Sequence, residues 1–290
     1  MDLIADAVGR KQTSMPAKGI SLHIGLNLVN PVHYGGWDGE LVACEFDAKD
    51  MKALADGKGF QSNMLLTAAA TADVVIGTIS SAAKQLVAGD VFLLTYSGHG
   101  GQVPDRNGDE TDPGRQDETW VLYDRQLIDD ELWNLWGRFK AGVRIFVLSD
   151  SCHSGTVTRQ MPAFLEAGPG SGAPPRVRML PPKQAALVYR KNAELYDGIQ
   201  KATPAGEKAA VRSSVVLVSG CQDNQFSLDG NRNGLFTETL KKVWNKGKFK
   251  GGYRRFRDSI AQRMPAEQTP NYSVVGKANA AFEAQTPFSI

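Results

Sequence analysis

Two short polar stretches of this 290-residue chain combine the residue types that nucleophilic catalysis requires. They read GHGGQ (98–102) and DSCHSG (150–155). A free cysteine thiol has a pKa near ~8.5, so a neighbouring imidazole must accept or balance its proton at neutral pH. Glycines beside the reactive groups let the backbone approach a substrate closely and leave its N–H groups available. We therefore predict that Cys152 is a nucleophile and that His99 is its general base.

The oxyanion formed in such a reaction needs backbone N–H donors already in place. Gly100 and Cys152 are the candidates for these donors. His153 directly follows the cysteine, but adjacent side chains on an extended segment point to opposite faces, which favours His99 as the base. His23 and His33 lie in no glycine-rich context and are interpreted as structural.

Each polar stretch directly follows an apolar run typical of a buried parallel strand, 91–97 and 144–149. Active sites of open α/β sheets lie at the carboxyl ends of strands, so neighbouring strands would bring His99 and Cys152 together. The intervening 98–118 is predicted as a polar loop. Other strands are expected at 21–29, 63–67, 120–123, 214–219 and 269–275, and helices at 46–58, 71–88, 129–140, 235–244 and 253–262. This alternation predicts an α/β fold with a mostly parallel sheet covered on both faces.

Composition excludes several classes of protein. The net charge is +2, from 33 basic and 31 acidic residues, which is too balanced to indicate nucleic-acid binding. No apolar run reaches the roughly 18 residues that a membrane span requires, and the first residues lack a signal-peptide core. We therefore expect a cytoplasmic protein with neither nucleic acid nor membrane as a partner. The three cysteines include no Cys-x-x-Cys pair, and their odd number predicts at least one free thiol.

Longer motifs around the two stretches resemble a known family. YSGHGGQ (96–102) and DSCHSGT (150–156) resemble the two catalytic motifs of the metacaspases, within the caspase-like peptidases. Further matches are CEFDAKDM (44–51), DDELW (129–133), VSGCQDNQ (218–225), GLFTETL (234–240) and QTP (268–270), so the resemblance spans roughly residues 18–276. It implies a caspase-like fold with a six-stranded sheet, and a cysteine endopeptidase that acts on proteins and peptides through a His–Cys dyad.

The resemblance also implies which bond is cut. Metacaspases hold Arg or Lys before the scissile bond with two aspartates, which map onto Asp47 and Asp150, while Ser97 and Cys44 map onto other pocket-lining positions. Asp150 precedes the nucleophile by two positions, which on a strand means the same face. Each charge-assisted bond from a guanidinium to a carboxylate contributes roughly 1.5–3 kcal/mol. We therefore expect cleavage after Arg and, second, after Lys.

Calcium is the metal that the resemblance implies, as an activator that the bond-breaking chemistry itself does not require. The implied ligands map onto Asp117, Asp129 and Asp130. A fourth family acid is replaced here by Arg159. Because Ca²⁺ gains affinity from each carboxylate, this replacement argues against tight binding.

The segment 160–212 opens with a Gly/Pro-rich run and is predicted to be a flexible processing insertion. It separates a large-subunit-like part, 18–159, from a small-subunit-like part, 213–290, after an N-terminal segment, 1–17. Caspase-like enzymes often mature by cleavage between these parts, either by themselves or by an upstream activating protease. The insertion offers basic residues for such a cut, among them Arg176, Arg178, Arg190, Lys191, Lys201 and Lys208.

The sequence leaves two alternative functions open. One is an inactive caspase-fold scaffold that binds peptides or partners, although both residues of the dyad are present. The other is a cysteine hydrolase or transferase of another fold that acts on a small acyl group, which would not need paired pocket aspartates. Metacaspases resemble monomers, so a monomer is expected.

Overall fold

A six-stranded sheet forms the centre of the computed structural model, which describes residues 16–108, 110, 115–152, 176–203, 211–222 and 225–290. Its strand order is β2-β1-β3-β7-β8-β9. The strands are β1 (Gly19–Gly25), β2 (Gln61–Leu66), β3 (Val91–Ser97), β7 (Arg144–Asp150), β8 (Ser214–Ser219) and β9 (Asn271–Gly276). All pairs are parallel except β8 with β9. The predicted mostly parallel six-stranded sheet is confirmed.

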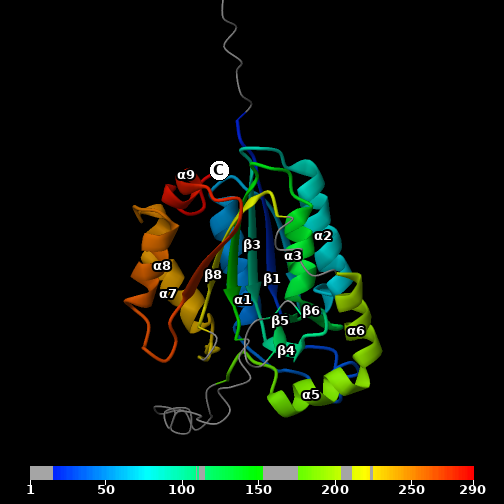
Figure 1. The fold of residues 1–290 in the computed structure, drawn as a ribbon. Helices are drawn as coiled ribbons and strands as arrows, with labels where there is room; N and C mark the ends of the chain where they lie inside the picture. The colour runs from blue at the N-terminus through cyan, green and yellow to red at the C-terminus, as the bar shows by residue number, and fades with distance from the viewer. Residues whose placement is uncertain (1–15, 109, 111–114, 153–175, 204–210, 223–224) are drawn as a thin grey trace, which may run out of the picture.

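Helices cover both faces of this sheet, as predicted (Figure 1). Successive residues of a strand point to opposite faces. Phe92 and Leu94 belong to the core beneath α2 (Ala72–Gln85) and α3 (Asp129–Gly137). The alternate residue Leu93 packs in a second core with α1 (Cys44–Asp56), α7 (Leu235–Trp244) and α8 (Tyr253–Ala261). Three further short helices accompany these layers: η1 (Thr67–Ala69), η4 (Asn245–Gly247) and α9 (Ala280–Ala284). Both faces therefore bury apolar side chains, at about 1.5–3 kcal/mol for each large one.

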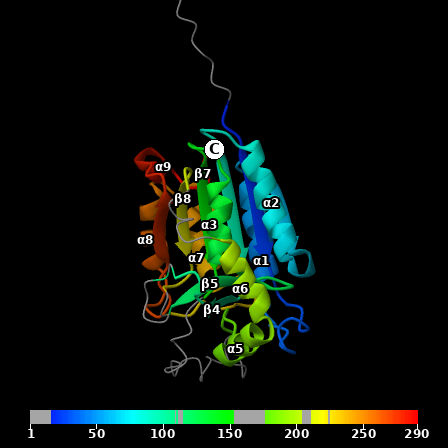
Figure 2. The ribbon, with the colours of Figure 1, turned by 45° about the vertical axis from the view of Figure 1, so that its right-hand side comes forward.

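A small antiparallel sheet lies at the end of the main sheet where β3 stops (Figure 2). It contains β4 (Gly100–Pro104), β5 (Gln116–Val121) and β6 (Gln126–Ile128), in that order. The prediction of a continuous loop over 98–118 is therefore wrong for 100–104 and 116–118. Gly100, Gly101 and Pro104 hide the strand from pattern analysis, and pairing with β5 satisfies its backbone.

Two further helices lie inside the segment predicted to be a flexible insertion. They are α5 (Pro182–Lys191) and α6 (Ala193–Ala202), and the sequence analysis predicted neither. Val188 and Tyr196 anchor them in a third core against Tyr34 and Val103. Pro182 stands at the first position of α5, where its missing N–H costs nothing. The Gly/Pro-rich beginning of the insertion, 160–175, lies outside the described residues.

Among the described residues, no helix is both long and apolar enough to span a membrane.

Candidate active site

The carboxyl ends of β3 and β7 bring the two predicted stretches to one place. Ser97 and Asp150 are paired in register, so His99 and Cys152 each follow two residues beyond the same level of the sheet. The backbone N–H groups of Gly100 and Cys152 both donate to one carbonyl oxygen, that of Arg178, at 3.1 Å each. The predicted oxyanion donors therefore converge on a single peptide carbonyl, with His99 and Cys152 beside it.

His99 is held in one orientation by its surroundings. Its Nε2 lies 2.9 Å from the carbonyl oxygen of Gly39, so Nε2 carries the proton and Nδ1 is the free base. The indole of Trp37 packs on the imidazole with ring centroids 4.7 Å apart, and the hydroxyl of Tyr96 donates to the His99 carbonyl at 2.7 Å. Burial lowers the pKa of His99 to about 4, although the carbonyls of Gly39 and Met179 oppose the shift. The imidazole is therefore neutral at neutral pH, as a general base must be.

Cys152 is completely buried, and its thiol contacts Cys221, Gln225 and Ser227. Sγ donates to the carbonyl of Gln225 at 3.2 Å, accepts from the backbone N–H of Ser227, and lies 3.2 Å from Sγ of Cys221. Nδ1 of His99 has no hydrogen-bond partner among the described residues, so the two groups are not bonded to each other in this state. In this state the thiol is instead hydrogen-bonded to the backbone of Gln225 and Ser227.

The guanidinium of Arg178 fills an acidic pocket next to the thiol. This side chain is fully buried, and it lies 2.7 Å from Asp47, 2.8 Å from Asp150 and 2.9 Å from Asp229. Nη1 also donates to the hydroxyl of Ser97 at 2.8 Å. A Cβ atom on Gly234 would lie 2.6 Å from the guanidinium, so only glycine leaves room there. The structure therefore brings together Asp47, Asp150 and Ser97, all three predicted from the sequence.

The pocket acids are fixed by donors other than the arginine. Asp47 accepts from the side chain of Asn233 at 2.8 Å, and burial raises its pKa to about 6 against the lowering effect of Arg178. Cys44 lies at the same pocket, where burial raises the pKa of its thiol and the nearby Arg178 cation opposes the rise. Asp150 accepts from the hydroxyls of Ser227 and Thr237 at 2.6 and 2.7 Å.

Sequence reasoning missed Asp229. Its two carboxylate oxygens accept from the backbone N–H groups of Val42 and Ala43 at 2.7 and 3.2 Å, which aims one of them at Arg178. Asp229 stands in a loop four residues beyond the VSGCQDNQ motif, where no hydrophobic periodicity indicates which way a side chain points. Gly39, whose carbonyl orients His99, was missed for the same reason, since a backbone contact leaves no sequence signal.

The residues around Arg178 lie in the site as an added strand. Arg178 N–H donates to the Ser227 carbonyl and Asp229 N–H donates to the Arg176 carbonyl, both at 2.9 Å. Beyond Arg178, the N–H of Leu180 donates to the Gly100 carbonyl at 2.8 Å. Such strand addition is a common mode of peptide recognition, because main-chain bonds give affinity and alternate side chains give specificity.

The three predicted calcium ligands are also adjacent. One oxygen from each of Asp117, Asp129 and Asp130 lies within 4.8 Å of the others, and Asp117 and Asp130 are buried. Carboxylate oxygens of this kind fit a hard cation such as Ca²⁺. Asp117 is on β5, and the other two begin α3. Arg159, where the family has an acid, lies outside the described residues.

Two of the remaining histidines lie away from this site. His23 is buried within the sheet between Ser21 and Thr95, at 2.9 Å from each hydroxyl. His33 Nε2 contacts the Tyr196 hydroxyl at 2.7 Å. Both have the structural settings expected from the sequence. His153 lies outside the described residues.

Comparison with known proteins adds to this geometry. A family model described as the caspase domain matches residues 26–281. Metacaspase-1 of Scheffersomyces stipitis is 27% identical over 240 residues, which cover 72% of this chain and 59% of that protein. Metacaspase-1A of Neurospora crassa is 36% identical over 141 residues, covering 43% of this chain and 31% of that protein. The chain thus spans less than two thirds of the length of these curated relatives.

Among solved structures, a protein from Geobacter sulfurreducens has a similar fold, with a TM-score of 0.84 and 51% sequence identity. The match covers 94% of this chain and 98% of that one.

Proposed function

Because this chain belongs to the caspase domain family and carries a cysteine peptidase domain of that family, we propose that it is an endopeptidase that cleaves proteins after arginine or lysine. The observation that carries this proposal is the position of Arg178. Its side chain occupies the acidic pocket while its carbonyl accepts both predicted oxyanion donors. An arginine peptide of the chain itself thus lies where a substrate would bind.

The proposed chemistry uses groups that already surround the Arg178 carbonyl. Nδ1 of His99 takes the proton of Cys152, and the thiolate attacks the carbonyl carbon of the residue in the pocket. The N–H groups of Gly100 and Cys152 stabilise the oxyanion. His99 then protonates the departing amine, and water hydrolyses the acyl-enzyme. None of these steps needs a cofactor.

The pocket favours arginine over lysine by its geometry. Three carboxylates approach the two terminal guanidinium nitrogens of Arg178 from different directions. An ammonium is a single point charge and cannot meet such a spread of acceptors in the same way. An aspartate substrate would be repelled by the pocket acids. We expect arginine first, lysine second, and no cleavage after aspartate.

The position of Arg178 in the candidate active site also indicates which bond of the segment 160–212 is processed. We propose that the Arg178–Met179 bond is cut during maturation, either by the chain itself or by an activating protease. The uncut segment fills the pocket and both oxyanion donors, so it also blocks external substrates.

Fluorogenic peptides with Arg, Lys or Asp before the leaving group test the proposed activity. The chain cut after Arg178 should hydrolyse the arginine peptide fastest, and Cys152→Ala should abolish turnover. Asp229→Asn should lower kcat/KM for the arginine peptide by about 10- to 100-fold, since it removes one charge-assisted bond. If the chain cut after Arg178 hydrolyses none of the peptides, with or without Ca²⁺, the inactive-scaffold alternative stands. Turnover that survives in Cys152→Ala would assign the reaction to another residue.

A further inference from the structure

Cys152 has a second cysteine as its immediate neighbour. Cys152 and Cys221 follow the carboxyl ends of β7 and β8, which are paired through Ser149 and Ser219. Their Sγ atoms lie 3.2 Å apart, and Cys221 also donates to the Ser151 carbonyl at 3.3 Å. Both are free thiols. The proposed peptidase reaction gives Cys221 no role.

We propose that Cys152 and Cys221 are a reversible redox pair, in which a peroxide joins the two sulfurs in a disulfide and so removes the nucleophile. The regulatory consequence depends on the proposed peptidase function, whereas the disulfide itself does not. Because an S–S bond is about 2.05 Å long, the two sulfurs need to approach by only about 1 Å.

The reaction balances with hydrogen peroxide as the oxidant. The Cys152 thiolate attacks one peroxide oxygen, so an S–O bond forms, the O–O bond breaks and hydroxide leaves. The product is already the sulfenic acid, and the leaving hydroxide takes up the proton that Cys152 gave to His99 and becomes water. The Cys221 sulfur then attacks the Cys152 sulfur, the S–O bond breaks, and the departing hydroxide takes the Cys221 proton as water. In total, two thiols and one peroxide give one disulfide and two waters.

The surroundings assign different roles to the two sulfurs. The hydrogen bond with Cys152 and burial raise the pKa of the Cys221 thiol well above its usual range. Cys221 therefore stays protonated while Cys152, beside the base His99, reacts first. Cys221 is the thiol that resolves the sulfenic acid because its sulfur lies 3.2 Å from that of Cys152. Cys44 lies instead at the acidic pocket beside Asp47, where it has no sulfur contact among the described residues.

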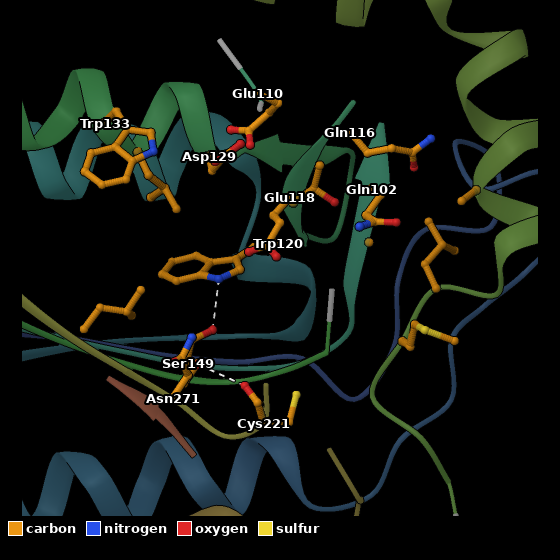
Figure 3. A pocket seen from close by; sticks show the side chains of 18 of the residues that line it. Gln102, Glu110, Gln116, Glu118, Trp120, Asp129, Trp133, Ser149, Cys221 and Asn271 are labelled. Carbon is orange, nitrogen blue, oxygen red and sulfur yellow. Dashed lines mark hydrogen bonds between the residues drawn. The ribbon is translucent and has the colours of Figure 1, made fainter. Parts of the chain in front are cut away.

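A small oxidant has a route to this pair. Cys221 and Met179 line a groove of about 1020 Å³ that extends along the sheet toward Trp133. Figure 3 shows Cys221 and Ser149 on one side of this groove and the carboxylates of Glu118 and Asp129 on the other. The groove reaches Cys221, and the sulfur of Cys152 lies directly behind it at 3.2 Å.

The disulfide would also protect the enzyme. A sulfenic acid with no resolving thiol is oxidised further to sulfinic and sulfonic acids, which thiol reductants do not reverse. With Cys221 adjacent, oxidation stops at a state that dithiothreitol can reduce. Peroxide would then switch the enzyme off without destroying it.

Mass spectrometry of the folded full chain after hydrogen peroxide treatment tests the proposal. We expect the chain to lose two hydrogen atoms and to yield a peptide pair linked through Cys152 and Cys221 that dithiothreitol separates. Cys44→Ser is the matched control and should form the same link. Cys221→Ser should form no link and should instead gain two or three oxygens on Cys152. Absence of the linked pair from the oxidised wild-type protein would overturn the proposal, whichever variants fold.

An activity arm separates this proposal from the proposed function. Dithiothreitol should restore most of the peptidase activity of oxidised wild-type protein, but little of that of Cys221→Ser. If no peptide is hydrolysed, the peptidase proposal fails while the mass readout still decides on the disulfide. Equal recovery in wild type and Cys221→Ser would show that Cys221 does not resolve the oxidised nucleophile.

Discussion

At the scale of single residues, the setting of Arg178 is the most informative. None of its side chain is exposed, and three carboxylates surround it. Burying a cation costs several kcal/mol unless partners compensate, and removing one partner of a buried pair typically costs about 3–5 kcal/mol. Arg176 offers a contrast, since it is exposed and only approaches Glu40 at 3.6 Å. Two arginines two positions apart therefore have different settings.

This contrast yields a prediction about maturation. Wild-type protein should release a fragment that begins at Met179, because among the described residues only Arg178 presents its carbonyl to both oxyanion donors. Arg178→Gln should abolish this cut, Arg178→Lys should slow it, and Arg176→Gln should leave it unchanged. N-terminal sequencing of the fragments measures the outcome.

Cys152→Ala distinguishes the two routes of processing. The purified variant should remain intact if the chain cuts itself. A Cys152→Ala chain that is nicked after Arg178 during expression would assign the cut to another protease. Cleavage after Lys201 or Arg190 in place of Arg178 would contradict the proposed cleavage site.

At the scale of elements, a buried histidine of the sheet makes the free energy of unfolding depend on pH. His23 in β1 is bonded to Thr95 of β3, and burial lowers its pKa to about 3. Burial similarly lowers the pKa of His99 to about 4. Between these values and their ordinary value of 6.5, the unfolded chain binds more protons than the folded one. The free energy of unfolding therefore falls as the pH decreases through this window.

His23→Gln tests this dependence far from the candidate site. The amide can still hydrogen-bond to Ser21 and Thr95 but does not titrate, so stability should fall less between neutral pH and about pH 5 than in wild type. Urea unfolding at several pH values measures the difference. Asp47, with its pKa raised to about 6, acts in the opposite direction and is the same in both proteins, so it cancels. Equal pH slopes in the two proteins would contradict a neutral His23.

At the scale of the whole molecule, β8 and β9 lie in the part predicted to resemble a small subunit, and they complete a sheet whose other strands lie in the part predicted to resemble a large subunit. The segment around Arg178, which links the parts, crosses the candidate site, and α5 and α6 then pack beside the small sheet. A cut at Arg178–Met179 would leave both parts joined through their shared sheet and cores. That the chain is a monomer stays a prediction. Light scattering of the purified chain, which measures its molar mass in solution, tests it.

The aspartate triad supports a prediction about calcium. It joins β5 to the start of α3, so a bound cation would hold the small sheet, which contains Gly100, against α3. Ca²⁺ should raise the melting temperature, since it binds only the folded chain. Asp117→Asn should weaken that shift, while Asp73→Asn on the exposed face of α2 should not. Thermal unfolding with and without Ca²⁺ measures the shifts, and identical shifts in all three proteins would contradict the site. A small shift in the wild-type protein would agree with weak binding, since Arg159 replaces the fourth acid of the family.

The sequence by itself determined the parts that depend on local pattern. Apolar runs at 91–97 and 144–149 predicted β3 and β7 nearly to the residue, because a buried parallel strand needs a continuous apolar segment. Their polar continuations marked His99, Cys152 and the N–H donors. The strand predicted at 21–29 instead spans 19–25, since apolar residues continue beyond the last ladder partner.

Only the tertiary structure decided what depends on contacts between distant segments. Asp229 and Asp47 meet at Arg178, although they are far apart in the chain, and Gly39 orients His99 through a backbone carbonyl. Cys221 lies beside Cys152 because β7 and β8 are neighbours, an order that no local periodicity encodes. Sequence pattern reports which face of an element is buried. Which side chains share a site follows from strand order and backbone pairing, which the whole chain sets together.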